Sequence, residues 1–317
     1  MLFSLLKIPA RIAFWFYCRN ISINKKEIFQ SNGPLLIAAN HPNSFLDAVL
    51  IATLFNQPVY SLARGDVFTK PFYAKILKSL NILPIYRITE GAENLEHNYN
   101  TFDACKKIFK NNGIVLIFSE GKCINEWHLR PLKKGTARLT INAWQDNIPL
   151  KVLPIGINYS SFHSFGKNIK LNFGKPISKD DFDKNDSYGK SILSFNNELQ
   201  NQLKELVIEI NKENKAAIKK EFIVPASPIK KILLFIPSLL GWVVHASFYY
   251  PLKKLAWNSN THKDHFDSIL MGFLFFAYPV YLLLLSLLVY WLVGSWWGLA
   301  VFFVLPFFAW SCLQLKE

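Results

Sequence analysis

The stretch LLIAANHPNSFLD, residues 35–47, decides the fold class. Its first five residues, Leu35–Ala39, form a continuous apolar run with the length of a fully buried strand. The run stops at the turn-forming group Asn-His-Pro-Asn, and a segment with helical length and spacing follows it. A buried strand that leads directly into a helix is the repeating unit of a parallel sheet, so this stretch predicts an α/β protein.

The same alternation continues along the chain. Four more short apolar runs predict buried strands at residues 59–63, 82–86, 114–118 and 152–156. Segments with helical length and spacing lie between or after the strands, at residues 44–55, 67–80, 91–110, 135–146 and about 191–220. We therefore expect a mostly parallel sheet flanked by helices, in a domain that spans residues 21–225. Ligands of such domains bind at the carboxyl ends of the strands.

Apolar residues are concentrated at the two ends of the chain. Hydrophobic residues make up 51% of the 317 residues and charged ones 18%, against about 25% charged in a typical soluble domain. Residues 1–20 predict an amphipathic helix in a membrane interface, with a helix packed on the core as the alternative. Residues 226–317 predict a membrane region, in which about 269–292 and 295–313 form a transmembrane hairpin. Residues 232–250 either span the membrane or re-enter it.

The charge balance narrows the classes of partner. The 36 basic and 22 acidic residues give a formal charge of +14, which in so apolar a chain favours anionic lipid headgroups or anionic substrates. We expect no nucleic-acid partner, since no aromatic RNA-binding or helix-turn-helix pattern occurs. The four cysteines are scattered and show no metal-ligand spacing, so no metal site is predicted. His262 and His265 are expected in a solvated loop.

The first candidate for chemistry is a histidine and aspartate pair. His41 follows the first strand, and Asp47 lies on the next helix, which Ser44 can cap. Helical side chains lean toward the N-terminus, so the carboxylate of Asp47 can reach the imidazole. A carboxylate on one ring nitrogen leaves the other basic, as removal of a hydroxyl proton requires. Taken alone, the pair is more typical of a turn histidine beside a first-turn aspartate than of a catalytic pair.

Cationic residues follow the ends of the other strands. The strand at 114–118 leads into Glu120 and Gly121, and the side chains that follow offer donors for a phosphate. Cys123 stands beside them, but no second histidine is placed to activate a thiol nucleophile. The candidate cations at the strand ends are Arg64, Arg87, Lys122, Arg130 and Lys133.

Four motifs in order resemble the glycerolipid acyltransferase superfamily over roughly residues 30–160. They are Asn40-His41 with Asp47, Ile82–Arg87, Phe118–Gly121 and Val152–Ile155. The resemblance implies transfer of a fatty acyl group from acyl-CoA or acyl carrier protein to a hydroxyl of glycerol-3-phosphate or lysophosphatidate. It implies no metal, no covalent enzyme intermediate and no cofactor besides the thioester co-substrate.

The resemblance also implies roles for individual residues. His41 would be the general base and Asp47 its orienting partner. Arg87 and the Glu120–Gly121 segment would bind the glycerophosphate, and Val152–Ile155 would shape the pocket. The chain would be an integral membrane enzyme with its catalytic domain on the cytoplasmic face, and its partners would be the bilayer, the thioester donor and the acceptor.

Two departures from the superfamily pattern leave the acceptor open. Five residues separate His41 from Asp47, one more than in the commonest form. The third motif continues as Lys122-Cys123, without the usual arginine, and Lys122, Arg130, Lys133 or Arg64 would replace it. The alternatives are an O-acyltransferase for another lysolipid or an amino-acid lipid, and a catalytically inactive lipid-binding membrane protein.

Overall fold

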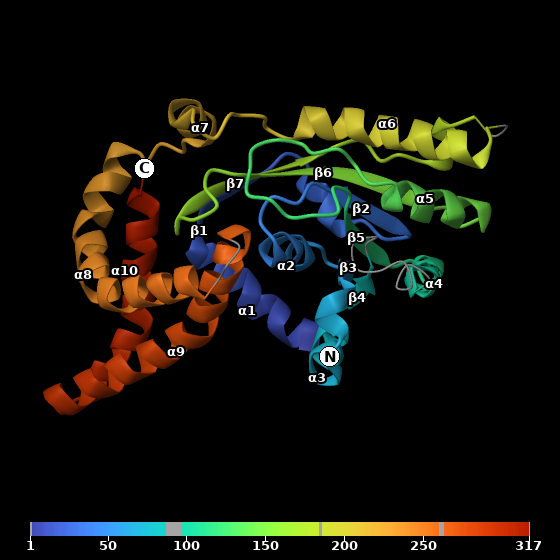
Figure 1. Ribbon diagram of the computed structural model, residues 1–317. Helices are drawn as coiled ribbons and strands as arrows, with labels where there is room; N and C mark the ends of the chain where they lie inside the picture. Colours follow the sequence, from blue (N-terminus) through green and yellow to red (C-terminus); the bar gives the residue numbers. More distant parts are fainter. Residues whose placement is uncertain (1, 87–96, 184–185, 260–262, 317) are drawn as a thin grey trace.

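A computed structural model describes residues 2–86, 97–183, 186–259 and 263–316. The described strands form one seven-stranded sheet in the order β1-β7-β6-β2-β5-β3-β4 (Figure 1). Neighbouring strands are parallel except for the pair β6 and β7, which confirms the predicted α/β fold with a mostly parallel sheet. The strands are β1 (Cys18–Ile23), β2 (Leu35–Ala39), β3 (Val59–Arg64), β4 (Ile82–Ile85), β5 (Ile114–Phe118), β6 (Lys151–Tyr159) and β7 (Lys167–Phe173).

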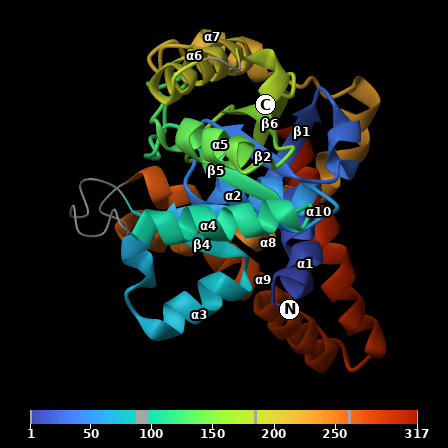
Figure 2. The ribbon, with the colours of Figure 1, turned by 90° about the vertical axis from the view of Figure 1, so that its right-hand side faces the viewer.

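Helices cover both faces of the sheet (Figures 1 and 2). On one face lie α1 (Leu2–Tyr17) and α2 (Phe45–Leu54). On the other lie α4 (His97–Lys110), α5 (Gly135–Gln145) and α6 (Tyr188–Leu206). The remaining helices of the domain are α3 (Pro71–Ser79), beside β4, and α7 (Lys215–Phe222), beside β7.

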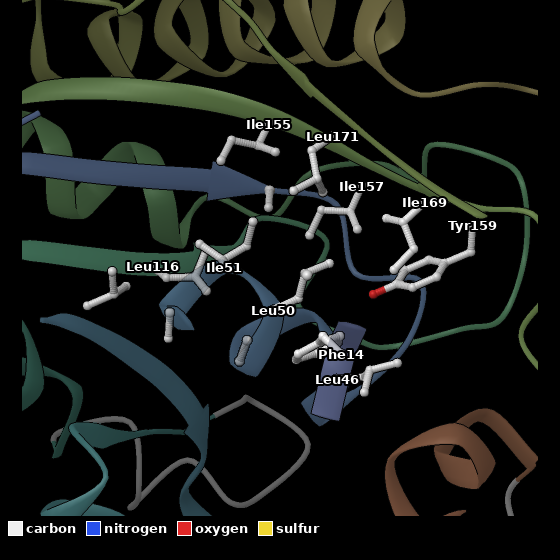
Figure 3. Close-up of a cluster of buried hydrophobic side chains, with 14 of the residues drawn as sticks. Phe14, Leu46, Leu50, Ile51, Leu116, Ile155, Ile157, Tyr159, Ile169 and Leu171 are labelled. Atoms are coloured by element: carbon white, nitrogen blue, oxygen red, sulfur yellow. The ribbon is translucent and has the colours of Figure 1, made fainter. Parts of the chain in front are cut away.

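The core lies on both sides of the central strand β2. Because successive side chains of a strand point to opposite faces, Leu35, Ile37 and Ala39 pack toward α1 and α2, whereas Leu36 and Ala38 pack toward α5 and α6. Figure 3 shows part of the first of these clusters, in which the labelled residues of α1, α2, β5, β6 and β7 meet. Complete burial of each large apolar side chain contributes roughly 1.5–3 kcal/mol. This packing fixes the position of the loop that follows β2.

Two unexpected strands and one divided helix are the main differences from the sequence prediction. The strands β1 and β7 were not expected: β7 alternates buried and half-buried residues instead of forming a continuous apolar run. The predicted helix at 191–220 is wrong in its middle, because α6 ends at Leu206 and α7 begins at Lys215. The side-chain amides of Asn158 and Asn172 donate to the carbonyl of Leu206 at 3.0 and 2.8 Å, and the chain leaves the helix there.

The N-terminal helix α1 packs on the end of α2. Lys7 Nζ donates to the carbonyl oxygens of Phe55 and Asn56 at 2.5 and 3.0 Å. Arg11 donates to the carbonyl of Leu54 at 3.2 Å. The two cations thus neutralise the C-terminal end of α2, where a helix carries partial negative charge. The opposite side of α1 exposes an apolar stripe of Leu5, Ile8, Ile12 and Trp15.

Three further helices gather on one side of the sheet domain (Figures 1 and 2). They are α8 (Pro228–Asn258), α9 (Phe266–Val293) and α10 (Val301–Leu315). In the described part of the chain, three helical segments at 228–258, 263–293 and 296–315 are long and apolar enough to cross a membrane. Figure 1 shows α8 bent, as expected for a helix that contains Pro237 and Pro251. The left-handed Gly294, at φ 65°, ends α9 and turns the chain toward α10.

Candidate active site

His41 and Asp47 meet at the carboxyl end of β2. His41 Nδ1 lies 2.9 Å from Asp47 Oδ2; the histidine side chain is 16% exposed and that of Asp47 is fully buried. Ser44 departs from its expected role: with φ 54° it makes no capping hydrogen bond to α2. The helix still starts early enough for the carboxylate to point back at the imidazole.

Asp47 is held by two further donors. The hydroxyl of Tyr159 donates to Asp47 Oδ1 at 2.8 Å, and the backbone N–H of Asn43 donates to Asp47 Oδ2 at 2.8 Å. A carboxylate that already accepts from these groups requires a proton on His41 Nδ1 for the third hydrogen bond. A neutral His41 ring then carries its lone pair on Nε2, and no described side chain bonds that atom.

The plane and backbone of His41 are also fixed. Its ring stacks on Phe118 with the centroids 3.8 Å apart and the planes 11° from parallel. Its backbone N–H donates to Glu120 Oε2 at 2.9 Å, while the backbone N–H of Arg130 donates to Glu120 Oε1 at the same distance. Burial raises the pKa of Glu120 above its usual value, and the two N–H donors partly offset this rise. The carboxylate of Glu120, expected to bind the acceptor, is thus used to join the β2 and β5 loops.

Gly121 and Lys133 lie next to each other on this loop. Gly121 has a left-handed backbone with φ 68°, and a Cβ there would lie 3.0 Å from Lys133 Cγ. The backbone N–H of Lys133 donates to the carbonyl of Ser119 at 2.7 Å, which brings the lysine back to the strand end. Lys122 and Lys133 are exposed to solvent. Arg130 Nε lies 3.5 Å from Glu126 Oε1. The structure therefore groups Gly121, Lys133 and the backbone of Arg130 around Glu120.

Of the other predicted cations, Arg64 has a partner outside this group. Arg64 pairs with Asp66, two residues further on, and its side chain is half exposed. Arg87 lies outside the described residues.

Cys123 is close to the site but shielded. The backbone N–H of Ser44 donates to Cys123 Sγ at 2.9 Å, and the side chain is buried. Burial raises the pKa of the Cys123 thiol far above its usual value, which disfavours the thiolate that a nucleophile requires. Among the described residues, no group of three or more His, Cys, Asp and Glu side chains is arranged to hold a metal ion.

Sequence analysis missed the contacts from the start of α9 to the loop at 40–44, which we call the His41 loop. Asn43 Nδ2 donates to Asp267 Oδ2 at 2.7 Å, and Ser44 Oγ lies 2.5 Å from His265 Nδ1. The backbone N–H of Leu46, in the first turn of α2, donates to Ser268 Oγ at 3.1 Å. The expectation of a solvated loop is therefore wrong for His265, and His262 lies outside the described residues.

Asp267 is the centre of a buried polar cluster. It accepts a hydrogen bond from the hydroxyl of Tyr17 at 2.8 Å and forms a short ion pair with Lys167. Both members of the pair are fully buried, and burial lowers the pKa of Lys167. One signal could have indicated this cluster: an acidic residue at the start of a long apolar segment is rarely without a partner.

The comparisons with known proteins agree with the motifs. A family model described as Acyltransferase matches residues 20–158. This segment is therefore a domain of the glycerolipid acyltransferase superfamily. The crystal structure of the 1-acyl-sn-glycerophosphate (LPA) acyltransferase PlsC from Thermotoga maritima is similar, with 14% sequence identity and a TM-score of 0.45. The similarity covers 71% of this chain and 81% of that chain. No curated protein matches.

Proposed function

We propose that this protein transfers a fatty acyl group from acyl-CoA or acyl carrier protein to a hydroxyl of glycerol-3-phosphate or lysophosphatidate. One observation carries the proposal: His41 is bonded through Nδ1 to a buried carboxylate, which leaves Nε2 as the basic nitrogen. A general base positioned in this way typically accelerates a reaction about 10²–10⁴-fold. The reaction requires a thioester co-substrate and no resident cofactor.

The proposed reaction balances with one proton that His41 first accepts and then returns. Nε2 takes the proton of the acceptor hydroxyl while the oxygen attacks the thioester carbonyl carbon. The carbon–sulfur bond then breaks, and the imidazolium gives the proton to the leaving thiolate. Asp47 stabilises the imidazolium formed between these steps, and Phe118 keeps the ring plane fixed.

The phosphate of the acceptor would bind beside Gly121. In our proposal Lys133, Lys122 and Arg130 supply the cationic donors, because all three lie on the loop that Glu120 joins to the backbone of His41. Arg64 and Arg87 remain candidates for a second contact. This assignment replaces the direct role expected for Glu120 with a positioning role.

We also propose that the domain lies on the cytoplasmic face of a membrane. Three apolar helical segments support membrane association, and the exposed apolar stripe of α1 is suited to the interface. Lysine pairs at 219–220 and 230–231 precede the apolar part of α8, and such basic residues favour the cytoplasmic side. A cysteine replacing the exposed Lys134 should react in intact cells with a membrane-permeant maleimide and not with an impermeant one. Reaction with the impermeant reagent would place the domain outside.

The test of the proposed activity is an assay with the purified full chain in detergent. Glycerol-3-phosphate and lysophosphatidate are offered separately with oleoyl-CoA and with oleoyl acyl carrier protein, and the lipid product is read by mass. His41→Ala should lower transfer by about 100-fold or more, whereas His128→Ala, an exposed histidine of the same domain, should not. Equal transfer by the parent and a folded His41→Ala variant would rule out the assigned base. Transfer only to a lysolipid without a terminal phosphate would identify a different acceptor.

A further inference from the structure

A cavity of about 760 Å³ lies among the helices outside the sheet domain. It is lined by α1, α8, α9 and α10 and by the loop at residues 164–165, which precedes β7. Its volume is in the range of sites that hold ligands of several hundred daltons, roughly 300–1,000 Å³. The cavity wall includes Tyr17, which bonds Asp267, but it includes neither His41 nor Asp47. The cavity is therefore separate from the candidate active site.

Most of the cavity wall is apolar. Its aromatic and aliphatic side chains include Phe16, Phe235, Trp242, Leu274 and Phe275. One polar pair in the wall is already bonded: His245 Nδ1 lies 2.8 Å from the carbonyl oxygen of Gly241, and His245 Nε2 lies 3.1 Å from the hydroxyl of Tyr278. Most of the wall therefore offers apolar contact, as an acyl chain requires.

Two lysines line the same cavity. Lys253 lies over the ring of Tyr249, with Nζ 5.9 Å from the centroid, and Lys316 Nζ donates to the carbonyl oxygen of Phe165. Burial lowers the pKa of Lys316, and the charge of Lys253 lowers it further. Both side chains line the cavity, and within the described chain neither forms an ion pair with a carboxylate. The carboxylate of Asp267 already pairs with Lys167.

We propose that this cavity binds one anionic phospholipid, with its phosphate at Lys253 and Lys316 and an acyl chain among α1, α8 and α9. The charge of the ligand follows from the two lysines that line the cavity, since each ammonium group attracts an anion and can donate hydrogen bonds to a phosphate. We infer an acyl chain on the ligand because the cavity wall is mostly apolar and the helices around it are long and apolar enough to cross a membrane. The site goes beyond the proposed catalytic function, because it neither contains His41 nor requires turnover.

The test measures lipid retention on a chain that does not turn over. The full-length His41→Ala variant is purified in detergent and titrated with dioleoyl phosphatidylglycerol or with dioleoyl phosphatidylcholine, neither of which is the product of the proposed reaction. Native mass spectrometry counts the bound lipid. We expect one phosphatidylglycerol per chain at concentrations at which phosphatidylcholine does not bind. Lys253→Gln and Lys316→Gln should each weaken phosphatidylglycerol binding about tenfold, the typical effect of one hydrogen bond to a charged group.

Two matched controls separate the site from general attraction to the basic surface. Lys254→Gln removes an exposed charge adjacent to Lys253 and should leave binding unchanged. Ala246→Trp fills the cavity and should abolish binding, whereas Val243→Trp, on the exposed side of the same helix, should not. Equal binding of the two lipids, or unchanged binding after both lysine substitutions or after Ala246→Trp, would overturn the proposal. A failure here leaves the acyl transfer assay unaffected, because that assay uses the parent chain and reads the product.

Discussion

The side-chain amide of Asn43 donates a hydrogen bond of 2.7 Å to Asp267 Oδ2, and this contact joins the His41 loop to the first turn of α9. The backbone N–H of the same asparagine donates to Asp47. A single residue thus connects the proposed catalytic pair to a helix that is long and apolar enough to cross a membrane. The position of Asp47 consequently depends on how α9 packs against the sheet domain.

The first prediction concerns the buried pair of Asp267 and Lys167. Asp267→Asn leaves the ammonium of Lys167 buried without its carboxylate, and breaking a buried pair costs about 3–5 kcal/mol of stability. Lys167→Met in the same chain should recover most of this loss, because the uncompensated charge is then gone. Denaturant unfolding of the detergent-solubilised proteins measures both effects. If the double variant is as unstable as Asp267→Asn, the ion pair is not the cause.

The second prediction concerns the hydroxyl of Tyr159. Tyr159→Phe keeps the ring in the core of Figure 3 but removes the donor to Asp47 Oδ1. A buried acceptor without its partner costs about 1–3 kcal/mol. We expect a lower kcat with little change in KM for either substrate, since the hydroxyl acts through Asp47. Tyr60→Phe is the control, because this half-buried tyrosine lies on β3. A change in KM alone would instead indicate direct contact of Tyr159 with substrate.

The third prediction is a pH dependence set by Glu120. Its folded pKa lies above the ordinary value of 4.5 because of burial, so the folded state holds this proton more tightly than the unfolded chain. Its contribution to stability is therefore present at low pH and declines as the pH rises from 4.5 through the folded pKa. Glu120→Gln removes this pH dependence of stability, because glutamine does not titrate. Its side-chain NH2 group also faces one of the two backbone N–H donors, those of His41 and Arg130, and cannot accept a hydrogen bond from it.

The measurement compares the unfolding free energies of the parent and the Glu120→Gln variant between pH 4.5 and neutral pH. The stability advantage of the parent should shrink as the pH rises. An advantage that grows with pH would show that the carboxylate is stabilised, and not destabilised, by its surroundings.

The fourth prediction concerns Cys123. Because its thiol is buried and its pKa is raised, Cys123→Ala should retain acyl transfer within about threefold of the parent, with a stability loss of about 1–2 kcal/mol from the lost Ser44 contact. Alkylation by iodoacetamide in the folded state should be slow at this position. An inactive but folded Cys123→Ala variant, together with a trapped acyl-thioester on the parent, would instead identify a thiol nucleophile.

Predictions from the sequence were accurate where one short segment contains all the information. The runs at 35–39 and 114–118 match β2 and β5 residue for residue, because a strand buried on both faces requires continuous apolar side chains. Because ligands bind at strand ends, the sequence predicted that His41, Glu120 and Gly121 lie at one edge of the sheet. It could not predict that the carboxylate of Glu120 accepts hydrogen bonds from two backbone N–H groups, since these contacts depend on how two loops pack.

What the sequence by itself determined is the alternation of strands and helices, the apolar C-terminal region and the spacing that lets Asp47 face His41. The tertiary structure alone decided which distant groups complete the site: Tyr159 lies 112 residues from Asp47, and Asp267 lies 224 residues from Asn43. The physical reason is one of range. Apolar periodicity is a local property that a few residues express, whereas a buried polar group takes whatever partner the packed chain brings within hydrogen-bonding distance.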